Sequence, residues 1–141
     1  MANLDSFYSA WTPRLLSVLR IITGFLFIAH GTQKLFNSPA SPQNAAAPLM
    51  SFMGLTGILE FVGGLLILFG LFTRPTAFIL SGMMAVAYFM AHAPGGFLPI
   101  VNKGELAVLY CFVFLFLAVS GGGEWSLDSL LRRGRATEVV V

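Results

Sequence analysis

Ionisable side chains stand inside the apolar stretches of this sequence, and their chemistry is its most informative feature. His30 and Glu60 lie in the first and second stretch, His92 ends the third, and Glu105 begins the fourth. Such groups are costly in a bilayer, so they usually face the interior of a helix bundle and have partners there. A carboxylate beside an imidazole can pass protons, which quinone reduction and proton-coupled transport both need. These four residues are therefore the catalytic candidates.

Two other interpretations of the same groups stay open. The acids could simply pair with Arg20, Lys34, Lys103 or the histidines and hold the helices in register. Two imidazoles and two carboxylates could also bind a transition metal. However, the sequence has no HxxxH or ExxH spacing, and the two lysines oppose a cation. We therefore expect no metal site.

Helical phase and depth predict where these groups meet. At 100° per residue, Arg20, His30 and the small and polar residues between them fall in an arc of about 120°. At 1.5 Å per residue, Glu60 lies near the bilayer midplane, whereas His30, His92 and Glu105 lie roughly 8–10 Å outward of it. Because helix side chains lean toward their N-terminus, Glu60 leans outward. We expect one cavity shared by the four candidates, with Arg20 either paired with Glu60 or snorkelling to the cytoplasmic surface.

The composition requires a membrane around these residues. The chain has 141 residues, enough for one domain, of which 57% are hydrophobic and 10% charged. A soluble domain usually has about 25% charged residues. The single cysteine, Cys111, excludes an internal disulfide and CxxC redox motifs. A net charge of +2 is too small to indicate a nucleic-acid partner.

Four apolar stretches have about the length that a bilayer span needs, close to 20 residues in a helix. We predict an all-α polytopic membrane protein with four transmembrane helices in an up-down bundle, within one domain over residues 13–120. The spans cover about residues 13–36, 50–72, 75–93 and 103–120. Thr12 is the expected N-cap of the first, with Pro13 at its first helical position. No small-x-small cleavage site follows this span, which favours a membrane helix over a signal peptide.

Two flanking segments and the charge distribution complete the predicted topology. Residues 1–12 are expected to form a separate interfacial helix, and residues 121–141 a cytoplasmic tail whose short helix begins at Ser126 and stops at Gly134. Lysine and arginine accumulate in cytoplasmic flanks. One side carries Arg14, Arg20, Arg74, Arg132, Arg133 and Arg135, and the other carries Lys34 and Lys103. Both termini should therefore be cytoplasmic.

A short internal similarity suggests a repeated unit. Residues 27–31, FIAHG, resemble residues 89–93, FMAHA, and each segment closes a helix that runs outward. Each is also followed by a returning helix that contains an acid. A duplicated helical hairpin would produce this pattern, and so could chance.

The motifs taken together resemble a known family. They are Arg20-x3-Gly24-x6-Gly31-x2-Lys34, Glu60-x2-Gly63-Gly64-x5-Gly70-x3-Arg74, His92, Asn102-Lys103-Gly104-Glu105 and Ser126-Leu127-Asp128. Over about residues 13–131 the chain resembles the DoxX family of small four-helix bacterial inner-membrane proteins. A related subunit belongs to thiosulfate:quinone oxidoreductase, so the resemblance implies a multi-pass plasma-membrane protein linked to redox metabolism. It also makes Arg20, Lys34, Asn102 and Lys103 candidate ligand-binding residues.

These expectations combine into one hypothesis with two alternatives. The chain is expected to be a redox-associated membrane subunit whose polar outward-half pocket binds a quinone or another small molecule. Glu60 would handle protons with His30 or His92, and Lys34 or Lys103 would contact an anionic or carbonyl group. The sequence encodes no haem, CxxC or dinucleotide motif, so electrons would come from an oxidoreductase partner. The alternatives are a small-solute or ion transporter and a non-catalytic structural subunit.

Overall fold

The computed structural model describes residues 2–40 and 46–138, and all the regular structure in them is helical. The prediction of an all-α protein is therefore confirmed for this part of the chain. The helices are α1 Ala2–Phe36, α2 Phe52–Phe69, α3 Thr73–Ala87, α4 Pro99–Asn102, α5 Glu105–Ser120 and α6 Leu127–Glu138. Between α3 and α4 the chain makes a π-helical turn, η1 Tyr88–His92, and a 3-10 turn, η2 Ala93–Gly95.

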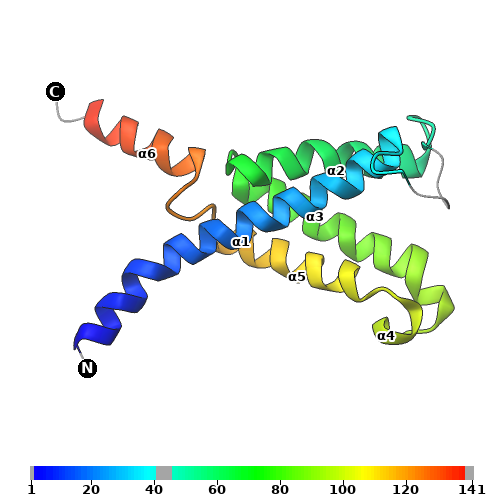
Figure 1. Ribbon diagram of the computed structural model, residues 1–141, viewed down its shortest axis with the longest axis horizontal. Coiled ribbons are helices and arrows are strands. Elements are labelled where there is room, and N and C mark those ends of the chain that lie inside the picture. Colours follow the sequence, from blue (N-terminus) through cyan, green and yellow to red (C-terminus); the bar gives the residue numbers. More distant parts are fainter. Residues whose placement is uncertain (1, 41–45, 139–141) are drawn as a thin grey trace.

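The long helices form two antiparallel hairpins. One consists of α1 packed along α2, and the other of α3 packed along α5. Figure 1 shows that α2 and α3 lie together at the short turn that joins them and diverge toward their other ends. The two hairpins therefore enclose a wedge that widens away from this turn. The N-terminal part of α1 and the C-terminal α6 project from the narrow end of the wedge (Figure 1).

Three helical segments are long and apolar enough to cross a membrane. They are Leu4–Phe36, Phe52–Phe69 and Thr73–Gly95, where the third includes both turns after α3. The fourth candidate, α5, is apolar but has 16 residues, a rise of about 24 Å, against a hydrocarbon core of about 30 Å. The chain is thus a multi-pass membrane protein with three or four spans.

Two predicted helix boundaries are wrong, and the first lies near the N-terminus. Pro13 lies inside α1, so the described residues before it, from Ala2 on, are continuous with the first span and do not form a separate helix. The Thr12 hydroxyl donates to the Tyr8 carbonyl instead of capping a helix start. The Pro13 carbonyl accepts hydrogen bonds from the Ser17 hydroxyl and from the Glu124 amide, and the second bond joins this turn to the loop after α5. Proline has no N–H, so the Ser9 carbonyl loses its helical donor, and Ser9 is exposed, where surrounding polar groups can replace that donor.

The second wrong boundary is at the C-terminal end. The helix α6 does begin as predicted, because the Ser126 hydroxyl accepts from the Ser129 amide. It does not stop at Gly134 but continues to Glu138. A glycine within a helix costs only about 1 kcal/mol relative to alanine, which neighbouring helix formers can offset. The side chain of Arg135 and residues 139–141 lie outside the described part of the chain, as do residues 41–45 of the predicted loop after the first span.

Glycines bring the backbones of α1 and α2 into contact. A Cβ atom on Gly31 would lie 2.5 Å from the Phe61 nitrogen, and one on Gly24 would lie 2.6 Å from the Leu68 nitrogen. The polar and small-residue arc predicted for the first span is thus the face that packs on α2. Small residues permit such close approach between membrane helices. The main apolar core lies between the hairpins and includes Phe27, Ile67, Leu80, Phe114 and Leu117.

Candidate functional site

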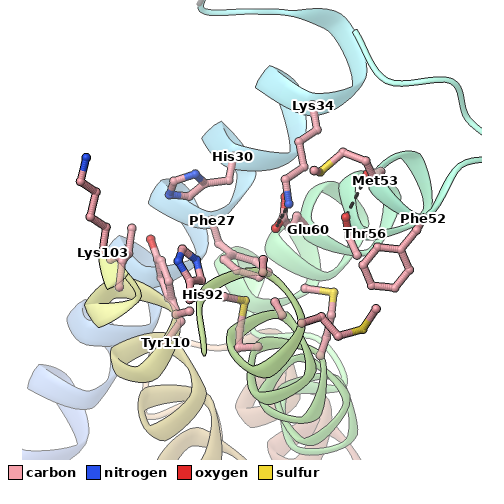
Figure 2. A pocket seen from close by; sticks show the side chains of 17 residues that line it. Phe27, His30, Lys34, Phe52, Met53, Thr56, Glu60, His92, Lys103 and Tyr110 are labelled. Atoms are coloured by element: carbon pink, nitrogen blue, oxygen red, sulfur yellow. Dashed lines mark hydrogen bonds and ion pairs between the residues drawn. The ribbon is translucent and has the colours of Figure 1, made fainter. Parts of the chain in front are cut away.

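A cavity of about 380 Å³ lies in the wedge between the two hairpins, and we call it the hairpin pocket. All four long helices contribute to its walls (Figure 2). Its lining residues are Phe27, His30, Lys34, Phe52, Met53, Thr56, Glu60, Met83, Met84, Ala87, Met90, Ala91, His92, Lys103, Leu106, Ala107 and Tyr110. Its volume is within the range of small-molecule sites, about 300–1,000 Å³.

An ion pair forms one wall of the hairpin pocket. The Lys34 Nζ atom of α1 lies 2.6 Å from the Glu60 Oε1 atom of α2, as the dashed line in Figure 2 shows. The Glu60 side chain is only 6% exposed, and its second oxygen, Oε2, is buried without a hydrogen-bond partner among the described residues. Buried polar atoms are nearly always satisfied, so an unpaired carboxylate oxygen in a cavity wall indicates a place for a ligand or water.

The two histidines line the same pocket from opposite hairpins. His30 comes from α1 and stands edge-on to Tyr110, with ring centroids 6.1 Å apart. His92 ends the π-helical turn, and its Nδ1 atom lies 3.1 Å from the Asn102 carbonyl oxygen. A carbonyl only accepts, so Nδ1 carries the proton in this bond, and the neutral tautomer that makes it has Nε2 as an acceptor. The predicted convergence of His30, Glu60 and His92 in one cavity is therefore what the structure shows.

Asn102 supports His92 and does not line the pocket. Its side-chain amide donates to the Gly96 carbonyl at 2.6 Å and to the Tyr88 hydroxyl at 3.2 Å. Its side-chain oxygen accepts from the Gly104 amide at 2.8 Å. This network fixes the chain between η1 and α5. It therefore also fixes the Asn102 carbonyl, which accepts from the His92 ring. π-Helical turns are rare and often occur at functional sites, where the extra residue redirects side chains.

Other predicted members lie apart from this cluster. Glu105 is exposed and is not a lining residue, so the expectation of one cavity shared by all four candidates is wrong for Glu105. It is the first residue of α5, where its phase turns it away from the buried face that carries Ala107 and Tyr110. Lys103 contributes to the rim, but its ammonium group points away from the other labelled side chains in Figure 2.

Arg20 occupies the opposite end of the bundle and neither pairs with Glu60 nor snorkels, so both alternatives predicted for it are wrong. Its side chain is 1% exposed and donates to four backbone carbonyls. Its Nε donates to Gly122 at 2.8 Å and its Nη2 to Trp125 at 2.7 Å, while Nη1 donates to Ile67 and Leu68. The last two carbonyls belong to the C-terminal turn of α2, where a cation is favoured by the helix dipole.

Asp128 makes the complementary contact at the same end of the bundle. Its Oδ1 and Oδ2 atoms accept from the amides of Phe72 and Thr73, both at 2.8 Å, and so cap the first turn of α3. Gly70, with φ of +68°, ends α2 between these two contacts. A Cβ atom there would lie 2.9 Å from the Arg20 guanidinium carbon. Arg20, Gly70 and Asp128 therefore join both hairpins and α6, and their role in this structure is architectural.

Tyr110 and the methionines are pocket residues that the sequence analysis missed. Tyr110 is 6% exposed and its hydroxyl end points toward His30 in Figure 2. Four of the six methionines in the chain, Met53, Met83, Met84 and Met90, line the pocket. Tyr110 is a tyrosine in an otherwise apolar helix, and its polar hydroxyl could have indicated that it faces the interior. The methionine positions could not have been predicted, because an apolar residue in a span can face either lipid or the interior.

Metal chemistry has no support in the described residues. Within residues 2–40 and 46–138, no three His, Cys, Asp or Glu side chains lie close enough to hold a metal ion.

Comparisons with known proteins identify what the chain is similar to. The sequence model of the DoxX family matches residues 15–93. An uncharacterized protein of Haemophilus influenzae is 43% identical over 92% of this chain and 96% of its own length. The inner membrane protein YqjF of Escherichia coli is 34% identical over 82% of this chain and 91% of its own. A Bacillus subtilis protein named "Putative oxidoreductase CatD" is 28% identical over 84% and 87%. No solved structure matches.

Proposed function

The chain belongs to the DoxX family of membrane proteins, and from that premise we propose that it is a redox-associated subunit of the bacterial inner membrane whose hairpin pocket binds a quinone headgroup. The observation that carries the proposal is the combination of a cavity of about 380 Å³ and an unpartnered carboxylate oxygen in its wall. The relative from Bacillus subtilis that is named as an oxidoreductase supports a redox role.

The walls of the pocket suit a flat aromatic ring. Phe27 and Phe52 offer ring faces and edges, and the four lining methionines offer thioether sulfurs. Sulfur–aromatic contacts stabilise by about 0.3–1.5 kcal/mol each, and the flexible methionine side chain adapts to the ring it meets. Phe52, Met53 and Met90 are each more than half exposed and form an apolar rim between α2 and η1. In a bilayer this rim would face lipid, which gives a lipid-soluble ligand a lateral entrance.

The polar groups of the pocket suit the ring substituents. Lys34 can donate to a carbonyl oxygen, and Glu60 and His92 can accept from a hydroxyl group. Both residues can also take or return a proton when the ring changes its redox state. The sequence has no haem, CxxC or dinucleotide motif, so in this proposal the electrons pass to or from a partner oxidoreductase.

A purely structural role fits these observations less well. A structural subunit would have fully satisfied ion pairs and no cavity. This chain has a cavity, and Glu60 in its wall keeps one carboxylate oxygen unpaired. Phe27, Leu80 and Phe114 belong to one apolar core cluster, and each is at most 1% exposed. A packed core of this kind favours a binding site over a continuous path through the bundle.

We also propose that α5 is the fourth span and that both termini are cytoplasmic. Arg14 contacts Glu124, and Arg74 and Arg132 line one hollow beside the turn between α2 and α3. Lys34 and Lys103 lie at the pocket end of the bundle. Gathered arginines mark a cytoplasmic side. The pocket, formed within the single domain of residues 13–120, would then lie in the outer half of the membrane, away from the tail, residues 121–141.

The test is direct ligand binding with a variant that fills the cavity. The purified protein in lipid nanodiscs is titrated with a short-chain benzoquinone by calorimetry, and quinones that co-purify are identified by mass spectrometry. Ala87→Phe adds a ring inside the pocket and should abolish binding. Val86→Phe adds the same ring at the neighbouring position, which is 48% exposed and outside the lining, and should bind normally. Equal binding by both variants would place the quinone elsewhere and refute the proposal.

A further inference from the structure

We infer that the hairpin pocket selects the hydroquinone form of its ligand over the quinone form. The inference rests on the proposed function and adds which redox state of the ring is held. It follows from the hydrogen-bonding groups that the pocket leaves unpaired. A quinone presents two carbonyl oxygens, which only accept, whereas a hydroquinone presents two hydroxyl groups, which also donate.

The most deeply buried unpaired group in the pocket is an acceptor. Glu60 Oε1 lies 2.6 Å from Lys34 Nζ, and in an ion pair of this geometry both carboxylate oxygens are acceptors. Oε2 has no donor among the described residues, although the side chain is only 6% exposed. An unmet acceptor of this kind is costly until a donor reaches it. A hydroquinone hydroxyl supplies that donor, while a quinone carbonyl would place two acceptors against each other.

The second fixed group in the wall is also an acceptor. In the neutral tautomer that donates from Nδ1 to the Asn102 carbonyl, Nε2 keeps its lone pair. The remaining groups do not reverse this preference, because a neutral imidazole such as that of the lining residue His30 offers one donor and one acceptor and so serves either redox form. Lys34 has further protons, but these can be accepted by either redox form, and the Tyr110 hydroxyl can serve as donor or acceptor. The exposed Lys103 directs its ammonium group away from the cluster (Figure 2).

The preference should be measurable as a ratio of dissociation constants. A hydrogen bond to an ionised group contributes enough to change affinity by about 10- to 100-fold. The protein in nanodiscs is titrated without oxygen against three probes with the same ring substituents and short chain. The probes are a benzohydroquinone, its benzoquinone and its dimethyl ether. The wild-type protein should bind the hydroquinone about 10- to 100-fold more tightly than the other two.

Glu60→Gln inverts the group that faces the ligand and is the decisive variant. Next to the Lys34 ammonium, the glutamine carbonyl takes the place of Oε1, so the amide NH₂ replaces Oε2 and donates into the pocket. The hydroquinone-to-quinone affinity ratio should fall at least tenfold and favour the quinone. Glu105→Gln is the matched control, because Glu105 is an exposed carboxylate outside the lining, and it should keep the wild-type ratio.

The outcomes separate this inference from the proposed function. Equal wild-type affinity for hydroquinone and quinone overturns the inference and leaves quinone binding intact. A full hydroquinone preference in Glu60→Gln also overturns it, because the selecting acceptor would then be another group. Binding of none of the three probes overturns the inference and the proposed function together. If Glu60→Gln does not fold, the comparison of the three probes on the wild-type protein decides alone.

Discussion

Replacement of Arg20 by methionine should destabilise the protein severely without altering the hairpin pocket. Methionine keeps most of the side-chain length and removes the guanidinium group. Of the four carbonyls that Arg20 binds, Ile67 also accepts from the Gly70 amide. Leu68, Gly122 and Trp125 have Arg20 as their hydrogen-bond donor in the described part of the chain. Three backbone acceptors are therefore orphaned by the substitution.

The magnitude follows from the burial of these carbonyls. An orphaned buried acceptor costs about 1–3 kcal/mol. The bonds to Leu68 and Trp125 are only partly buried, so water can replace some of the loss there. The lower part of the range then applies, and the expected decrease in the free energy of unfolding is about 3–5 kcal/mol. Arg20→Lys should lose less, because an ammonium group can still reach one or two of the carbonyls.

The assay is equilibrium unfolding in mixed micelles of a mild and a denaturing detergent, followed by far-ultraviolet circular dichroism. Arg14→Met is the matched control. Arg14 pairs with Glu124 at 3.2 Å, but the two side chains are 40% and 30% exposed, and such pairs contribute about 0–1 kcal/mol. Ligand affinity of folded Arg20→Met should equal that of the wild type, because ten helical residues, about 15 Å, separate Arg20 from His30. If both methionine variants unfold alike, water satisfies the carbonyls and the reasoning is refuted.

Two further predictions test the helix packing and the topology. Gly31→Ala should lower the free energy of unfolding by about 1–3 kcal/mol, because the new methyl group would meet the α2 backbone. Gly82→Ala is the control, because no atom lies within 4 Å of its new methyl group, and it should be neutral or stabilising in the same detergent titration. A reversed order would contradict the close α1–α2 contact. Reporter fusions after Arg74 and at the C-terminus should report the cytoplasm, and a fusion within residues 37–48 the outside, because arginines gather on one side. An external signal at either of the first two positions would invert the proposed topology.

The sequence determined the membrane class and one face of the first helix. Long apolar stretches leave few structures that a bilayer tolerates, and helices satisfy every backbone group within the segment. Helical phase then placed Arg20, Thr23 and Gly24 on one face, and all three are buried. The same reasoning predicted that His30, Glu60 and His92 would meet, because charged groups inside a membrane protein gather away from lipid.

Tertiary structure decided what each of those groups contacts. Phase and depth could not show that Arg20 finds its partners in carbonyls of residues 122 and 125, because those acceptors come from a loop a hundred residues later. They could not show that Glu105 turns outward, since the phase of α5 is set by its packing on α3. The local sequence likewise could not show that the helix continues through Pro13, because Thr12 and Pro13 match a helix start equally well. The pocket itself exists because the two hairpins join at one end through Arg20 and Asp128 and diverge at the other, and only the assembled fold contains that wedge.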